Sequence, residues 1–165
     1  MPLEQRPAIA VIGVGNALRG DDGAGPTVLG RLRAECPAGV ELCESDGEVT
    51  GLLDALSGRR AAIVVDAVCS GAEAGTVHCW RDDGPALAVL RSSTHALGVA
   101  DALALAEALQ RRPHRVTVVA IEARHFAPGE PLSPPVAQAV DPAAAVVRRE
   151  LAHWLQEVPP CTSSR

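Results

Sequence analysis

The chain of 165 residues contains no lysine and no tyrosine. A catalytic lysine, a Schiff base and the lysine of a P-loop are therefore excluded. Aromatic residues make up only 2 % of the chain, as Trp80, Phe126 and Trp154, so it has no aromatic platform for single-stranded nucleic acid. The net charge of −5 and the pI of about 5.5 argue against a phosphate backbone as ligand, and we expect no nucleic acid partner.

Long apolar runs and paired cysteines are also missing. The first apolar run, Ala8–Val14, is too short for a secretory signal and far below the roughly 20 residues that cross a bilayer. The number of cysteines is odd, and no two of them have C-x-x-C spacing: Cys36, Cys43, Cys69, Cys79 and Cys161. We therefore expect free thiols, a cytoplasmic location and no membrane partner.

What the sequence does contain is enough Ala, Val, Leu and Ile for a core, since 47 % of the residues are hydrophobic. The length fits one domain, which we predict over residues 1–158, followed by a disordered tail over 159–165.

Short apolar runs alternate with helical patterns along the chain. Strands are predicted at 8–12, 40–43, 61–66, 76–80 (an edge strand) and 116–121. Helices are predicted from Pro26 to about 35, at 52–56, at 98–110, and from Pro142 (with Asp141 as N-cap) to about 158. This alternation predicts an α/β fold with a mainly parallel sheet and helices on both faces. Ligands of such sheets bind outside the carboxyl ends of the strands, so polar residues that follow strands carry the functional information.

The loop after the first strand, Gly13–Gly25, is rich in glycine and contains two adjacent carboxylates. It is not a dinucleotide-binding loop, because Leu18 stands where G-x-G-x-x-G needs its third glycine. One of Asp21 and Asp22 can cap the helix that Pro26 joins, and the sharper alternative is a carboxylate that faces a metal.

Two further loops carry polar candidates. Asp66 ends an apolar strand; because a carboxylate is costly inside a protein, we place it at the rim of the sheet, where neighbouring loop amides can bond it. His95 precedes a predicted helix, where it can cap that helix or bind a metal. The other histidines lack such a setting: His78, His114, His125 and His153.

Together Asp22, Asp66 and His95 suit a divalent ion such as Zn²⁺, Ni²⁺ or Mn²⁺. Covalent acyl catalysis has little support, because the chain has no G-x-S-x-G elbow and no cysteine with an evident histidine partner. Cys69 is the nearest candidate, and we expect it to be a buried free thiol.

In order and spacing, three segments resemble the maturation endopeptidases of nickel–iron hydrogenases. They are the loop Gly13–Gly25, the strand end Val64-Val65-Asp66-Ala67, and Ser93-Thr94-His95-Ala96-Leu97-Gly98, and the resemblance extends over residues 8–154. One departure is Asp46-Gly47-Glu48-Val49-Thr50, where many members have Asp-Gly-Gly-Thr; it bears on the identity of the partner more than on the reaction.

The resemblance implies a three-layer α/β fold around a five-stranded sheet. It also implies removal of a C-terminal extension from the hydrogenase large-subunit precursor after nickel insertion. Carried over by position, the residues that contact the metal are Asp22, Asp66 and His95, whereas the role of Asp21 is left open. Nickel would arrive with the substrate, and with only these three weak ligands we expect no tightly bound cofactor.

Two alternatives stay open. A nickel-site checkpoint or chaperone that binds the precursor without cutting it would use the same residues, and a small-molecule hydrolase on a related scaffold is the other, since a fold does not determine a function. A precursor must dock, so we also predict an exposed apolar patch that includes Leu18, Val68 and Leu97.

Overall fold

The computed structural model describes residues 6–81 and 97–157. Its strands are β1 (Ile9–Val14), β2 (Val40–Ser45), β3 (Ala61–Val68), β4 (Val77–Arg81) and β5 (Arg115–Glu122), in the sheet order β2-β1-β3-β5-β4. β4 is antiparallel to β5, and all other pairs are parallel. The predicted three-layer α/β fold, with β4 as an edge strand, is confirmed.

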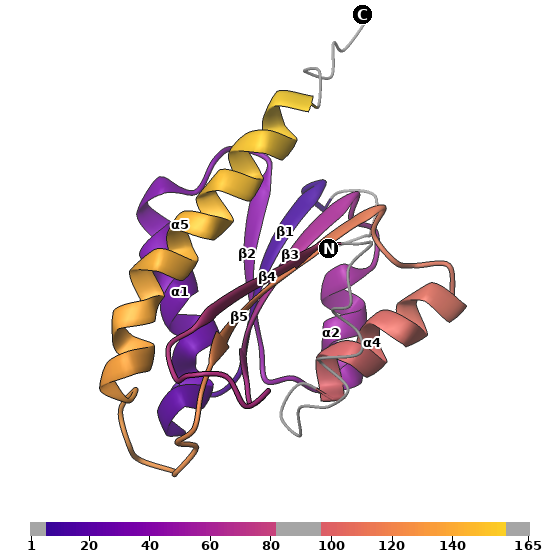
Figure 1. Cartoon of the computed structure of the whole chain (residues 1–165). Helices are drawn as coiled ribbons and strands as arrows, with labels where there is room; N and C mark the ends of the chain where they lie inside the picture. The colour runs from indigo at the N-terminus through magenta and orange to yellow at the C-terminus, as the bar shows by residue number, and fades with distance from the viewer. Residues whose placement is uncertain (1–5, 82–96, 158–165) are drawn as a thin grey trace, which may run out of the picture.

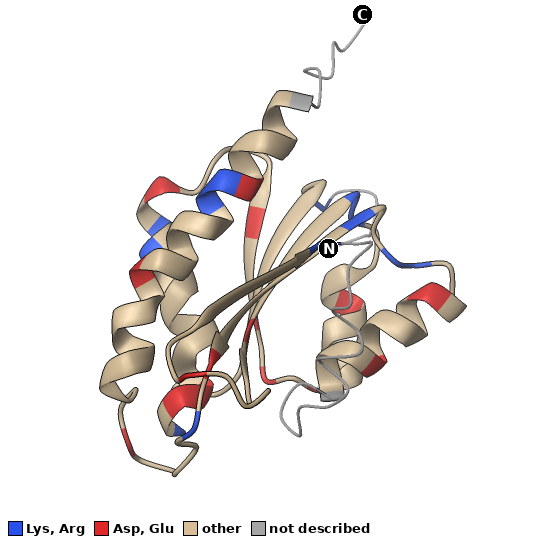
Figure 2. Ribbon diagram, in the orientation of Figure 1, with Lys and Arg blue, Asp and Glu red and all other residues tan. Residues whose placement is uncertain are grey.

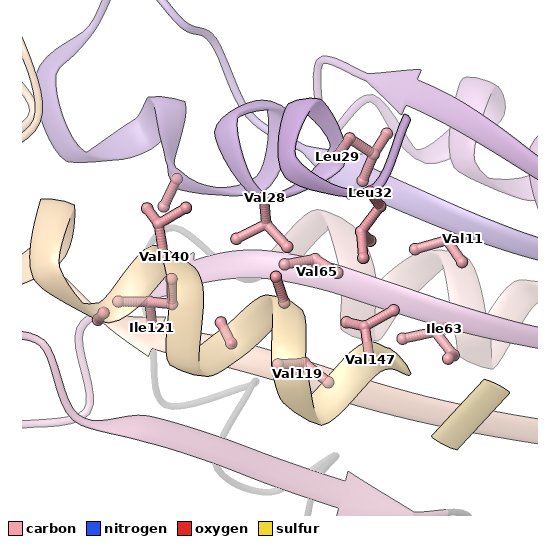
Figure 3. Packing of buried hydrophobic residues seen from close by; sticks show 14 of the residues in the cluster. Val11, Val28, Leu29, Leu32, Ile63, Val65, Val119, Ile121, Val140 and Val147 are labelled. Carbon is pink, nitrogen blue, oxygen red and sulfur yellow. The ribbon is translucent and has the colours of Figure 1, made fainter. Parts of the chain in front are cut away.

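Helices cover both faces of this sheet (Figure 1). Helices α1 (Ala24–Leu32) and α5 (Pro134–Glu157) lie on one face, and α2 (Val49–Leu56) and α4 (Leu97–Ala108) lie on the other. Odd-numbered residues of β3, such as Ile63 and Val65, pack against α1 and α5, as Figure 3 shows. Even-numbered residues, such as Val64, belong to the second core beneath α2 and α4. Because side chains alternate along a strand, the face to which each sheet residue points follows from its number.

The strand order places a topological switch point between β1 and β3. From β1 the chain crosses through α1 to β2 on one side, and the next strand, β3, pairs with β1 on its other side. In open α/β sheets, a crevice forms outside the carboxyl ends of the two strands at such a point. The loop that follows β1 carries Asp22, and the last residues of β3, close to this point, include Asp66.

The prediction that Asp141 and Pro142 open the last helix is wrong. Helix α5 begins at Pro134, directly after Ser133, and Pro142 lies inside it. The side chain of Asp141 is 76 % exposed and pairs with Arg31 of α1, at 3.2 Å between Nε and Oδ1. Buried residues on both sides of Pro142 hold α5 against the sheet, so packing sustains the helix through a residue that lacks an N–H.

The third strand is longer than predicted. β3 continues for two residues beyond Asp66, so this carboxyl group lies within the strand and not at its end. The cysteines among the described residues are free and half-buried, as predicted for the thiols in general: Cys36, Cys43, Cys69 and Cys79. Cys161 and the tail predicted over 159–165 lie outside the described residues. Among residues 6–81 and 97–157, no helix has the length and apolar character needed to cross a membrane.

Gly25 sets the distance between α1 and the crevice strands. A Cβ built on Gly25 would lie 2.3 Å from the carbonyl oxygen of Val14 and 2.6 Å from that of Val65. We expect Gly25→Ala to lower the free energy of unfolding by about 2–4 kcal/mol, because backbone atoms must move to admit the methyl group. Urea unfolding measures this change.

Gly30 provides the matched control in the same helix. It is exposed, and a Cβ built on it meets nothing within 4 Å. Gly30→Ala is expected to raise the free energy of unfolding by about 0.5–1 kcal/mol through helix propensity. Equal effects of the two substitutions would contradict this account of helix placement.

Candidate active site

The loop between β1 and α1 folds back on itself and brings Asp22 to the carboxyl end of β1. The backbone N–H of Asn16 donates to Asp22 Oδ2 at 3.0 Å, and Asn16 Oδ1 accepts the N–H of Leu18 at 2.9 Å. Gly15 has φ of +123°, and a Cβ there would lie 2.0 Å from the carbonyl oxygen of Asp22. Glycine is therefore required at this position for the carboxylate of Asp22 to take its place.

Asp66 is buried, which corrects the prediction that it sits at the rim of the sheet. The residue is only 3 % exposed. Its Oδ1 accepts the N–H of Ala67 at 2.8 Å, and not an amide of a neighbouring loop. Its Oδ2 is buried and has no hydrogen-bond partner within the described part of the chain. A buried carboxyl oxygen without a partner is costly in the resting protein, and it is the kind of atom that a bound cation would satisfy.

Burial raises the pKa of Asp66 to about 8, and the negative charge of Asp22 adds to this rise, while the Ala67 N–H opposes it. Asp66 is therefore protonated at neutral pH, which explains how the fold tolerates it inside a strand. Asp22 lies near enough for its charge to act on Asp66. The two carboxyl groups thus form a pair near the carboxyl ends of β1 and β3.

His95 lies outside the described residues, so the third predicted member of the site stays a prediction. The structure does describe the helix that follows His95 in the sequence. This helix, α4, begins with Leu97 and Gly98, and a Cβ built on Gly98 would lie 2.2 Å from the carbonyl oxygen of Gly47. Gly47 follows β2, so α4 starts at the carboxyl edge of the sheet, beside the crevice. Within residues 6–81 and 97–157, no group of three or more metal-ligating side chains comes together.

Asp21 has a different role from Asp22. It is fully buried, and its carboxylate accepts the backbone N–H groups of Arg124 (3.1 Å), His125 (3.0 Å) and Ser133 (2.7 Å). Burial alone would raise the pKa of Asp21, but these N–H donors outweigh it and lower the pKa. The prediction that Asp21 or Asp22 caps α1 is wrong: Gly23 is the N-cap, and no side chain bonds there. Asp21 instead fastens the first loop to the segment between β5 and α5.

We expect Asp21→Ala to lower the free energy of unfolding by about 3–5 kcal/mol, because buried backbone donors lose a charged acceptor. Since the folded protein lowers the pKa of Asp21, its contribution is present at neutral pH and is lost as the pH falls through that lowered value. Urea unfolding at pH 7 and at acid pH measures both effects. The exposed Asp101 supplies the control, Asp101→Ala, and an Asp21→Ala variant as stable as this control would contradict the anchoring role.

Comparison with known proteins identifies the family of the chain. Residues 34–150 match the family model described as hydrogenase maturation protease. The chain belongs to the hydrogenase maturation protease family. It is 34 % identical over 165 residues to the hydrogenase expression/formation protein HupD of Rhodobacter capsulatus, covering 96 % of this chain and 78 % of that protein. It is 32 % identical over 139 residues to the hydrogenase 2 maturation protease of Escherichia coli K12, covering 82 % and 85 %.

Among solved structures, the chain is similar to the hydrogenase maturating endopeptidase HybD of Escherichia coli. The TM-score is 0.78 at 28 % identity, and the match covers 88 % of this chain and 92 % of that one. A member of this family is a peptidase, so the predicted enzyme class is confirmed. The five-stranded fold implied by the resemblance is confirmed as well.

The surface of this family member is hollowed beside Gly15, the glycine that packs against Asp22. A groove of about 500 Å³ runs between the loop after β1 and the loop after β2, and its lining includes Asn16, Ser45 and Asp46. Figure 2 shows several acidic segments around this end of the sheet. The loop that departs from the family pattern, residues 46–50, therefore borders the site.

The predicted apolar docking patch is only partly supported. Leu18 is 75 % exposed at the tip of the first loop, as expected for a docking residue. Val68 is fully buried in the core beneath α4, so its inclusion is wrong. Leu97 begins α4, and its side chain is outside the described part of the structure. Cys69 is half-buried, donates its S–H to Ala123 O at 3.0 Å, and has its pKa raised by burial, so it is not set up as a nucleophile.

His78 and Glu122 form a polar pair that was not predicted from the sequence. His78 lies in β4 and Glu122 ends β5, and their side chains meet at 3.3 Å on the face of the sheet that also carries Asp66. The available signal was the alternation in residues 77–81, which places His78 and Trp80 on one face of an edge strand.

Proposed function

We propose that this chain removes the C-terminal extension of a nickel–iron hydrogenase large-subunit precursor after nickel has been inserted, by metal-assisted peptide hydrolysis. The observation that carries the proposal is the buried carboxyl group of Asp66, whose Oδ2 is unpartnered in the described structure and which lies beside Asp22 at the switch point. The names of the relatives, which are maturation proteases of hydrogenases, support the substrate class.

In this proposal Asp22, Asp66 and His95 contact the nickel ion, which the thiolates of the precursor hold. A dication at the pair favours the ionised carboxylate, so its arrival displaces the proton that Asp66 holds at neutral pH. The site therefore responds to the charge of the substrate's metal. A precursor without nickel meets a protonated Asp66 and gains no such contact.

The chemical step is hydrolysis of one peptide bond. Nickel polarises the scissile carbonyl or activates the attacking water. The hydroxyl of that water bonds to the carbonyl carbon, the C–N bond breaks, and the leaving amine takes the remaining proton. Asp22 and Asp66 would hold the ion together with the thiolates of the precursor, and the chain supplies too few ligands of its own to retain it.

Mass spectrometry tests this function. A nickel-loaded large-subunit precursor from the same genome is incubated with the chain, and the proposal predicts the loss of one C-terminal peptide at a single bond. Tight binding with no change in mass would instead support the non-cleaving checkpoint. Neither binding nor cleavage would reject both.

A further inference from the structure

The groove of about 500 Å³ beside Gly15 adjoins the candidate active site directly. Gly15 lines the groove and packs against Asp22. The next lining residue is Asn16, whose backbone N–H donates to Asp22 Oδ2 at 3.0 Å. A volume of this size lies within the range of sites that hold ligands in proteins. A molecule in the groove would therefore lie close to the carboxylate of Asp22.

The two walls of the groove are held in place by the fold. One wall is the loop after β1 and the other is the loop after β2. The N–H of Gly15 joins them, because it donates to the carbonyl oxygen of Ser45 at 2.9 Å. Helix α4 backs the second wall, since a Cβ built on Gly98 would lie 2.2 Å from the carbonyl oxygen of Gly47. The groove is thus formed before a ligand arrives, which lowers the cost of ordering on binding.

The side chain of Asn16 is fixed with its N–H groups unused. Its Oδ1 accepts the N–H of Leu18 at 2.9 Å, which assigns the orientation of the amide and leaves Nδ2 at the other end. Asn16 is exposed and lines the groove. Within residues 6–81 and 97–157, no acceptor bonds its Nδ2. The amide therefore offers two N–H donors at the first wall.

The opposite wall supplies acceptors. The carboxylates of Glu44 and Asp46 are exposed there, and a carboxylate only accepts hydrogen bonds. The hydroxyl of Ser45 accepts the N–H of Gly47 at 3.3 Å and keeps its own hydrogen for a further bond. Nearly every residue of a polypeptide carries one donor and one acceptor on its backbone. A groove with donors on one wall and acceptors on the other therefore fits an extended peptide, whereas the carboxylates would repel an anionic ligand.

We propose that this groove holds the precursor's peptide next to the scissile bond, and that Nδ2 of Asn16 donates to a backbone carbonyl of that peptide. Covalent geometry keeps Nδ2 within about 5 Å of the backbone nitrogen of Asn16, which bonds Asp22. An extended peptide advances about 3.3 Å per residue, so the carbonyl that Asn16 binds lies within about three residues of the bond held at Asp22. This inference rests on the proposed function, since it assigns one subsite of the same reaction.

Two substitutions of Asn16 separate a substrate contact from a role in the turn. Asn16→Ser and Asn16→Asp both keep an oxygen that can accept the N–H of Leu18, but neither has an N–H at the position of Nδ2. We expect Asn16→Ser to raise KM for the nickel-loaded precursor by roughly three- to tenfold with kcat unchanged, the size of one lost hydrogen bond. Asn16→Asp is expected to raise KM at least as much.

A role confined to the turn predicts a wild-type KM for both variants, and that result would overturn the inference. A rise in KM for Asn16→Asp alone would also overturn it, because the added charge and not the lost donor would then be the cause. Urea unfolding is expected to show both variants as stable as wild type, since the bond to Leu18 is kept.

Gly51 of α2 tests the groove independently of Asn16. It lines the groove and is exposed, and a Cβ built on it meets nothing within 4 Å, so Gly51→Leu places bulk at the groove without a clash in the fold. We expect Gly51→Leu to raise KM by about tenfold or more, because the peptide loses its space. The matched control is Gly30→Leu: Gly30 is exposed on α1 with equally open surroundings, and KM and kcat should not change.

Thermal melting checks that each glycine variant folds. If Gly51→Leu does not fold, Gly51→Gln, which has a polar side chain of similar length, must show the same rise in KM. A folded Gly51 variant with the KM of wild type would mean that the peptide does not lie in this groove.

A failure of the proposed function remains distinguishable from a failure of this inference. If the wild-type chain binds the precursor but does not cleave it, the same variants are compared by the Kd of the intact precursor. The weakening expected for Asn16→Ser is then the same roughly three- to tenfold. Equal Kd values for wild type, Asn16→Ser and Gly51→Leu would reject the subsite.

Discussion

Asp66→Asn and Asp22→Asn are each expected to reduce kcat/KM for the nickel-loaded precursor by about 100- to 1,000-fold. Each substitution removes one negative oxygen ligand from a site that supplies few ligands, and charge stabilisation at a metal or developing anion typically accounts for effects of this size. Asparagine keeps the shape of both side chains. Asp22→Asn also keeps an oxygen that can accept the N–H of Asn16, so the loop should stay in place.

Initial rates of peptide release from the precursor, followed by mass spectrometry, measure this loss. Asp101→Asn is the matched control, because Asp101 is exposed on α4, and its rate should equal that of wild type. A folded Asp66→Asn variant with more than about a tenth of the wild-type kcat/KM would show that the buried carboxyl group is not a ligand of the substrate's metal.

The second large effect concerns stability and pH. Folding raises the pKa of Asp66 from 3.8 to about 8. Between these two values the folded state holds a proton that the unfolded state has released, so this group lowers the stability of the protein as the pH rises from about 4 to about 8. Above about pH 8 the cost is constant, because both states are then ionised.

Asp66→Asn removes this titration. Relative to wild type, its free energy of unfolding is therefore expected to increase with pH over this range, by up to about 5 kcal/mol in total. Urea unfolding of both proteins at pH 5, 7 and 9, without added metal, measures the difference. Asp101→Asn should follow the wild-type curve at every pH. A constant difference between Asp66→Asn and wild type would mean that the carboxyl group of Asp66 titrates normally in the folded protein.

The carboxyl group of Asp66 is thus expected to increase activity and to decrease stability. If both predictions hold, the residue that lowers stability at neutral pH is the one on which activity depends, as is common where a fold keeps a costly group for function. The carboxyl pair is therefore better explained by what it binds than by what it contributes to the fold.

Much of the architecture could be predicted from the sequence, because it is encoded locally. The buried strands appear as short β-branched runs, and the predicted strand at 40–43 corresponds to β2 with two further residues. The start of α5 was missed although Ser133-Pro134 is a helix-start signal of the same kind as Asp141-Pro142. Local sequence rules cannot decide which of two such signals begins the helix. Packing of Val136 and Val140 in the core beneath α5 favours the earlier start.

The site was predicted only in part, because its electrostatics depend on residues far apart in the chain. The hydrogen-bond partners of Asp21 lie more than 100 residues away along the chain, so nothing local distinguishes the buried Asp21 from its neighbour Asp22. Asp66 was placed at the rim by the argument that a charge is costly inside, which holds for a carboxylate but not for the neutral acid that burial produces. The contact between His78 and Glu122 was not predicted, because only the register of β4 on β5 brings the two residues together.

Dependence on the substrate's nickel is the central claim, and one comparison tests it most directly. The chain is first dialysed against a chelator, and nickel-loaded and nickel-free forms of one precursor are then incubated with it side by side and followed by mass spectrometry. The account predicts that only the nickel-loaded precursor loses its C-terminal peptide, and that Asp22→Asn and Asp66→Asn leave it intact over the same time. Cleavage of the nickel-free precursor at the wild-type rate would contradict it.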